Sequence, residues 1–169
     1  ARAIPSQKSS FAAKSNAIYE DATGAILKAE RRNPSGSAVN TAATLQDIAA
    51  SVDNSAIAKI IHDPKLGQIA EALGTGQAAK FGDLRALRTW VREAQSDPTL
   101  RKGVSEAALA RLEGALTQDI LTSAQAIGGQ QAAQRLARAD DFYRAGMNRI
   151  NKALASFGDG RGSSAYMKI

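Results

Sequence analysis

The chain has 169 residues, 44% of them hydrophobic and 22% charged, so it is long enough to bury a core and suits one compact domain. It contains no cysteine, which excludes disulfide bonds, thiolate chemistry and a zinc ribbon. The formal net charge of +6 favours acidic partners, whether nucleic acid, acidic lipid or an acidic protein surface.

The spacing of apolar residues points to helices throughout. Alanine, which costs least to place in a helix, is frequent, and only 5% of residues are aromatic. Every long segment repeats its apolar residues with the helical period, and none alternates as a half-buried strand does. We therefore predict an all-α fold, an array or bundle of about six to seven helices with short turns and no sheet.

The first half of the chain contains three predicted helices. The first covers residues 6–32 and ends at Asn33–Pro34, a strong helix breaker. A second begins near Asn40, and Asp53–Asn54–Ser55 offers both its end and a cap for a short helix over residues 56–61.

Capping residues divide the next part of the chain. Asp63–Pro64 predicts a helix start, because aspartate accepts from free backbone N–H groups and proline has no N–H to leave unpaired. That helix should stop at Gly74, and the one after it should end at Asp97–Pro98. Ser105 is predicted to cap a helix that breaks at Gly128–Gly129.

The last predicted helix runs to about residue 157. Leu136, Tyr143 and Ile150 recur every seven residues along it, so they should form one buried face. Residues 158–169 are rich in glycine and serine and are predicted to be a mobile tail or a linker to a following segment. The remainder, residues 1–157, is predicted to be a single α-helical module.

Motifs for catalysis and for metal or cofactor binding are missing from the sequence. His62 is the single histidine, which excludes a site built on two histidines, and no GxSxG or GxxxxGK[ST] motif occurs. Asp140 is expected to pair with Arg144 one helical turn away. We predict a protein that is not an enzyme and has no metal and no cofactor; a hydrolase with carboxylates assembled across helices is the third-ranked hypothesis.

Two stripes of basic residues are candidate polyanion-binding sites. The i, i+3, i+7 spacing of Arg85, Arg88 and Arg92 places them on one helix face. The second, looser stripe consists of Arg135, Arg138, Arg149 and Lys152. Such stripes contact phosphates without reading base sequence, so nonspecific nucleic-acid binding is the alternative function, with Arg85, Arg88, Arg92, Arg135 and Arg138 as its candidate residues.

Trp90, the single tryptophan, has two interpretations. It lies beside the first basic stripe, and tryptophan is favoured at protein interfaces, so it is a candidate partner anchor. The other interpretation is a contact within the core or between helices.

Residues 80–150 resemble a helical segment of very large bacteriophage virion proteins of the tape-measure-like, internal-virion or DNA-ejection kind. The resemblance rests on an F-x-D-L-x-x-L-R start, then R-L-x-x-A-L-x-x-D, then L-x-R-A-x-x-F-Y-R. These residues are Phe81, Asp83, Leu84, Leu87 and Arg88; Arg111, Leu112, Ala115, Leu116 and Asp119; and Leu136, Arg138, Ala139, Phe142, Tyr143 and Arg144.

The resemblance implies a structural, protein-interaction module of a larger phage or prophage protein. Its partners would be other segments of that protein or other virion proteins. The chain starts without methionine and shows neither a signal peptide nor a run of eighteen apolar residues. We therefore expect a fragment of a longer chain, with no membrane span, located in the virion or the bacterial cytoplasm.

Overall fold

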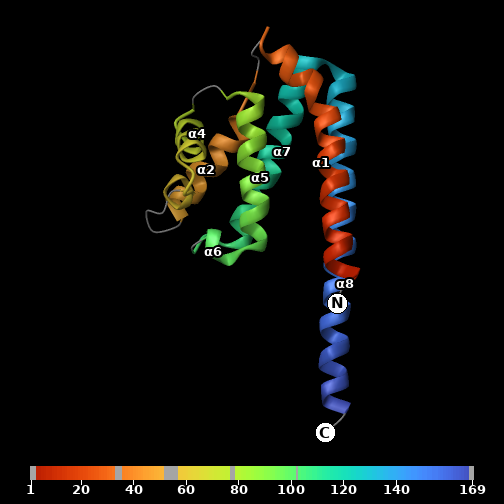
Figure 1. Ribbon diagram of the computed structural model, residues 1–169. Helices are drawn as coiled ribbons and strands as arrows, with labels where there is room; N and C mark the ends of the chain where they lie inside the picture. Colours follow the sequence, from red (N-terminus) through yellow and green to blue (C-terminus); the bar gives the residue numbers. More distant parts are fainter. Residues whose placement is uncertain (1–2, 33–35, 52–56, 77–78, 102, 168–169) are drawn as a thin grey trace. The chain divides into compact units, whose positions relative to one another are not determined.

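The computed structural model describes residues 3–32, 36–51, 57–76, 79–101 and 103–167, and within them it contains helices and turns but no strand (Figure 1). The helices are α1 (Ala3–Glu30), α2 (Val39–Ser51), α3 (Ile57–Ile60), α4 (Pro64–Gly74), α5 (Phe81–Ser96), α6 (Pro98–Arg101), α7 (Glu106–Gly128) and α8 (Gln130–Met167). Only α3 and α6 are single turns. The predicted all-α fold is confirmed.

The chain divides into two compact units, where the sequence predicted one module over residues 1–157. One unit contains Ala1–Gly24 together with Gln134–Ile169, and the other contains Ala25–Ala133. The division arises because the first part of α1 packs on α8, two segments from opposite ends of the chain.

The unit formed by residues 25–133 is built around α7, which packs against both α2 and α5. Leucine and isoleucine from α7 form the centre of its core, with Leu109, Leu112, Leu116 and Ile120 fully buried. α7 runs antiparallel to α2 and to α5, because successive contacts advance along one helix and recede along the other. This arrangement makes α7 the support on which the rest of the unit is assembled.

A buried carboxylate attaches the start of α2 to α7. Ala38, which precedes α2, has no side-chain acceptor, and Asp119 of α7 supplies one. Its two carboxylate oxygens accept from Thr41 N at 2.7 Å, Asn40 Nδ2 at 2.9 Å and Asn40 N at 3.3 Å. One turn further along α7, Ser123 Oγ accepts from the Ser37 N–H at 3.0 Å. A helix end that lacks a local cap is thus satisfied by a neighbouring helix.

The start of α5 is capped in the same way. Lys80 occupies the N-cap position and makes no side-chain capping bond; the Glu30 carboxylate accepts from the Phe81 N–H instead. The chain before α2 also approaches the chain before α5 closely, since a Cβ on Gly36 would overlap the carbonyl oxygen of Ala79. The beginnings of α2 and α5 therefore lie at the same end of this unit.

The structure confirms the helix starts and the helix end that were predicted from local capping residues. Asp63 Oδ1 accepts from Lys65 N at 2.9 Å, and Pro64 is the first residue of α4. Ser105 Oγ accepts from Ala108 N at 3.1 Å at the start of α7. Gly129 ends α7 with a φ of 85°, a positive value that glycine adopts without steric cost.

We expect Asp63→Ala to lower the free energy of unfolding by about 1 kcal/mol, because two N–H groups of α4 lose their acceptor. Asp63→Asn should be nearly neutral, since asparagine caps equally well. Urea unfolding with an unchanged m-value would measure both effects. Equal losses for the two variants would contradict this role of the carboxylate.

The α5–α7 connection contains one turn of helix that the sequence did not predict. Asp97 ends α5 as expected, but Pro98 begins α6. The Thr99 hydroxyl donates to Asp97 Oδ1 at 2.7 Å, and the Thr99 N–H donates to the same oxygen at 3.0 Å. Both bonds lower the pKa of Asp97 below its ordinary value, and the bond from the Thr99 hydroxyl has the larger effect.

In the other unit, α1 and α8 run side by side in opposite directions (Figure 1). Phe11 packs against Phe142 and Tyr143, with ring centroids 5.7 Å and 6.0 Å apart. Tyr19 donates its hydroxyl to Asp140 Oδ1 at 2.6 Å, and both residues are buried. Phe142 and Tyr143 therefore serve helix packing, as the periodicity predicted for Tyr143.

Two features of α8 differ from the prediction. The structure places Asp140 against Tyr19, and Arg144 Nη1 lies 4.0 Å from Asp141 Oδ1, whereas the sequence assigned Arg144 to Asp140. The helix also continues to Met167 through the segment predicted as a mobile tail. Extending an existing helix adds one hydrogen bond for each residue that becomes ordered. Each glycine in the segment opposes this extension by only about 1 kcal/mol.

Candidate functional site

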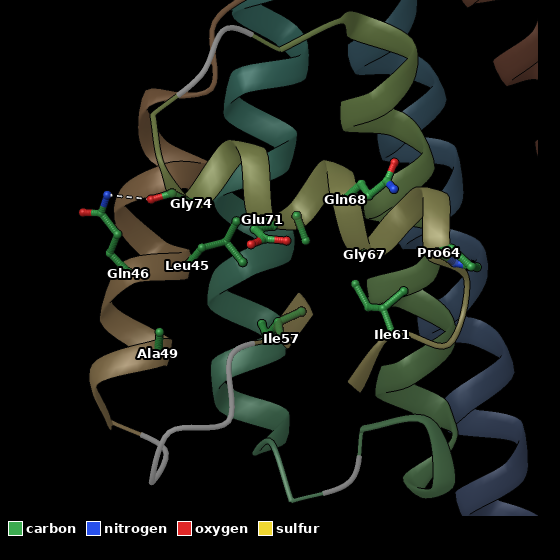
Figure 2. A pocket seen from close by; sticks show the side chains of 11 residues that line it. Leu45, Gln46, Ala49, Ile57, Ile61, Pro64, Gly67, Gln68, Glu71 and Gly74 are labelled. Atoms are coloured by element: carbon green, nitrogen blue, oxygen red, sulfur yellow. Dashed lines mark hydrogen bonds between the residues drawn. The ribbon is translucent and has the colours of Figure 1, made fainter. Parts of the chain in front are cut away.

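A groove lies between α2 and α4, with α3 below it, in the unit formed by residues 25–133 (Figure 2). Its volume is about 540 Å³, within the range of ligand pockets. Eleven residues line it: Leu45, Gln46, Ala49, Ile57, Ile61, Pro64, Gly67, Gln68, Ala70, Glu71 and Gly74.

The floor of the groove is apolar. Leu45, Ile57, Ile61 and Ala70 are buried in the core of the unit and present part of their surface to the hollow. Leu45 comes from α2 and Ala70 from α4, while Ile57 begins α3 and Ile61 directly follows it. An apolar floor of this kind favours an apolar guest, because contact removes both surfaces from water.

The rim of the groove is polar and exposed. Gln46 Nε2 donates to the Gly74 carbonyl at 2.9 Å across one end, which joins α2 to the last turn of α4, and Pro64 lies at the other end (Figure 2). Gln68 is exposed on the α4 side. Gly67 has no side chain, so the backbone of α4 itself forms part of the wall.

The lining limits the chemistry of the groove. Glu71 is the only charged residue among the eleven, and none of them is a histidine, lysine, serine or cysteine. His62 is exposed and follows α3, outside the lining. In the described part of the chain, no three His, Cys, Asp or Glu side chains lie close enough together to hold a metal ion. The groove thus offers apolar contact, amide hydrogen bonds and one carboxylate.

The predicted basic face of α5 lies in the contact with α7. Arg88 is 2% exposed and donates from Nη1 to Thr117 Oγ1 at 3.2 Å. Arg92 Nε lies 3.4 Å from Glu113 Oε1, and its side chain is 13% exposed, while Arg85 is partly exposed. The three arginines were predicted to form a polyanion-binding stripe on one helix face, and the structure instead turns Arg88 and Arg92 toward a neighbouring helix.

The reason is the width of the buried surface of α5. This helix contacts α4, α6 and α7, so more than one apolar stripe is covered. Phe81, seven residues before Arg88 and hence on the same face, is fully buried. The sequence did contain a signal: Arg88 and Arg92 are one turn apart, and so are their partners Glu113 and Thr117 on the antiparallel helix.

Trp90 is 7% exposed and belongs to the core. A partner anchor must present its ring to the partner, so the structure favours the packing interpretation of Trp90 over the interface one. Arg135 and Arg138, in contrast, are exposed on α8, as predicted.

None of the comparisons with known proteins gives a match. No family model, no curated protein and no solved structure matches the chain. The described helices include none with the length and apolarity needed to cross a bilayer. Function must therefore be argued from the groove and from the charged surfaces.

Proposed function

We propose that the chain is a non-enzymatic, helical protein-interaction module of a larger phage or prophage virion protein, and that its groove binds an amphipathic helix. The apolar hollow between α2 and α4 is the observation that carries the interaction part of this proposal. The resemblance of residues 80–150 to phage virion proteins supports the setting. The partner would be another segment of the same protein or another virion protein.

The residues that line the groove indicate which kind of partner would bind there. A helix that buries aliphatic side chains in an apolar groove is a common mode of peptide recognition. Glu71 at the rim favours a lysine or arginine on the occupant, and Gln68 offers a hydrogen bond beside it. The predicted occupant is therefore a basic amphipathic helix with leucine or isoleucine anchors.

The test is titration of the isotope-labelled chain with helical peptides that cover the remaining segments of the parent protein, followed by amide chemical shifts. We expect one such peptide to shift the amides of Ala49, Gly67 and Glu71. Ala49→Arg should weaken its binding at least about tenfold, because the new side chain occupies the mouth of the groove.

Ala50→Arg is the matched control. Ala50 is the next residue of α2, is also exposed and does not line the groove, so this variant should bind the peptide as the unchanged chain does. Equal affinities of the two variants would refute the groove as the binding site. Failure of every peptide to shift groove amides would refute the proposed partner.

A further inference from the structure

One face of α8 carries four basic residues in two pairs, with Phe142 and Ala145 between the pairs. Helical geometry places Arg135, Arg138, Arg149 and Lys152 within an arc of about 100° around the helix axis, and all four side chains are exposed. At about 1.5 Å per residue, they extend over roughly 25 Å of the helix. We call these four residues the α8 basic face.

Two acidic residues, Asp140 and Asp141, lie near this face in the part of α8 whose side chains the structure describes. Asp140 is 4% exposed and accepts the hydroxyl of Tyr19, on the side of α8 that contacts α1. Asp141 lies 4.0 Å from Arg144, which is outside the arc. Asp141, three residues after Arg138 and just outside the arc, offsets part of the positive charge, and the four exposed basic side chains present the remainder to solvent.

From this placement we infer that the α8 basic face binds the phosphate backbone of nucleic acid without base specificity. Its charges form two pairs, and the gap of about 16 Å from Arg138 to Arg149 is wide enough to span the roughly 12 Å major groove of a duplex. Each pair can contact phosphates on one edge of that groove. This activity is separate from the proposed α2–α4 groove and does not depend on it.

The packing of α8 favours nucleic acid over a membrane surface. A helix that binds lipid must insert an apolar face among the headgroups. On α8 that face is already occupied: Leu136, Ala139 and Ile150 are buried, and Phe142 and Tyr143 pack against Phe11. Most of the exposed side chains of α8 between residues 135 and 156 are charged or polar, with Leu154 the large apolar exception, and this surface matches a polyanion that displays regularly spaced phosphates.

The test is fluorescence anisotropy of a labelled duplex of arbitrary sequence, measured with the full chain between about 50 and 200 mM salt. Four phosphate contacts predict a log–log salt slope of about −3.6, which lowers the affinity roughly a hundredfold over this range. Replacing the α8 basic face (R135Q/R138Q/R149Q/K152Q) should remove that slope, and R135Q/R138Q should remove about half of it.

The matched control removes the same amount of charge from four exposed residues of the unit formed by residues 25–133 (R31Q/R32Q/K65Q/K80Q). It should keep most of the slope. Equal loss in both quadruple variants would overturn the inference, since net charge alone would then explain binding. So would equally tight binding of polyglutamate, or binding of anionic vesicles in preference to the duplex. Circular dichroism should show unchanged helix content in all variants.

Discussion

Replacement of Asp119 by alanine should lower the free energy of unfolding by about 3 kcal/mol. Asp119 is 2% exposed and accepts three hydrogen bonds at the start of α2. Without it, the buried Thr41 N–H has no acceptor within the first turn, and no side chain at Ala38 can replace the cap. Thermal or urea unfolding would measure the loss.

Asp47 provides a control at the other end of the same helix contact. Its carboxylate lies 3.3 Å from Arg111 Nη2, and both side chains are more than half exposed. Solvent screens such a pair, so Asp47→Ala should cost less than about 1 kcal/mol. Asp119→Asn should fall between the two, because one acceptor oxygen remains. Equal losses for Asp47→Ala and Asp119→Ala would contradict the capping role.

The Asp119→Ala substitution should also loosen the groove, because α2 forms one of its walls. When its first turn is no longer attached to α7, Leu45 and Gln46 are positioned less rigidly opposite α4. Amide hydrogen exchange should therefore accelerate in α2 of Asp119→Ala more than in α5. Faster exchange spread evenly over both helices would indicate global loss of stability instead.

Features set by residues near each other in sequence could be predicted. The caps at Asp63 and Ser105 and the break at Gly129 depend on neighbours within four residues, so the sequence was sufficient. The same holds for the apolar face of α8, where Leu136 and Ile150 are buried and Tyr143 is half-buried at the predicted spacing. Helical periodicity is a local property as well.

Features set by a second helix could not be predicted. In the sequence, Asp119 is one polar residue among others in α7. No residue near it in the sequence indicates that it caps α2, whose Thr41 lies 78 residues earlier. Arg88 reads as a surface charge until α7 covers it. The α2–α4 groove has the same origin, since its floor and walls come from separate helices and no single segment carries its pattern.

Gly36→Ala is the second substitution with a large expected effect, a loss of about 2–3 kcal/mol in the free energy of unfolding. The sequence places Gly36 only in the break that follows the first helix. In the structure, a Cβ there would overlap the carbonyl oxygen of Ala79, in the chain just before α5. A backbone group cannot rotate away as a side chain can, so the two connections must separate. The melting temperature should fall by about 4–12 °C.

Gly114→Ala is the control, with the opposite sign expected. Gly114 lies within α7 and is exposed, and a Cβ there would meet no atom within 4 Å. Alanine should therefore stabilise the helix by about 0.5–1 kcal/mol and raise the melting temperature. If Gly36→Ala also raised it, the close approach of the two connections would not exist in solution. A fall at Gly36 with a rise at Gly114 would show that packing against Ala79, and not glycine content, sets the requirement at Gly36.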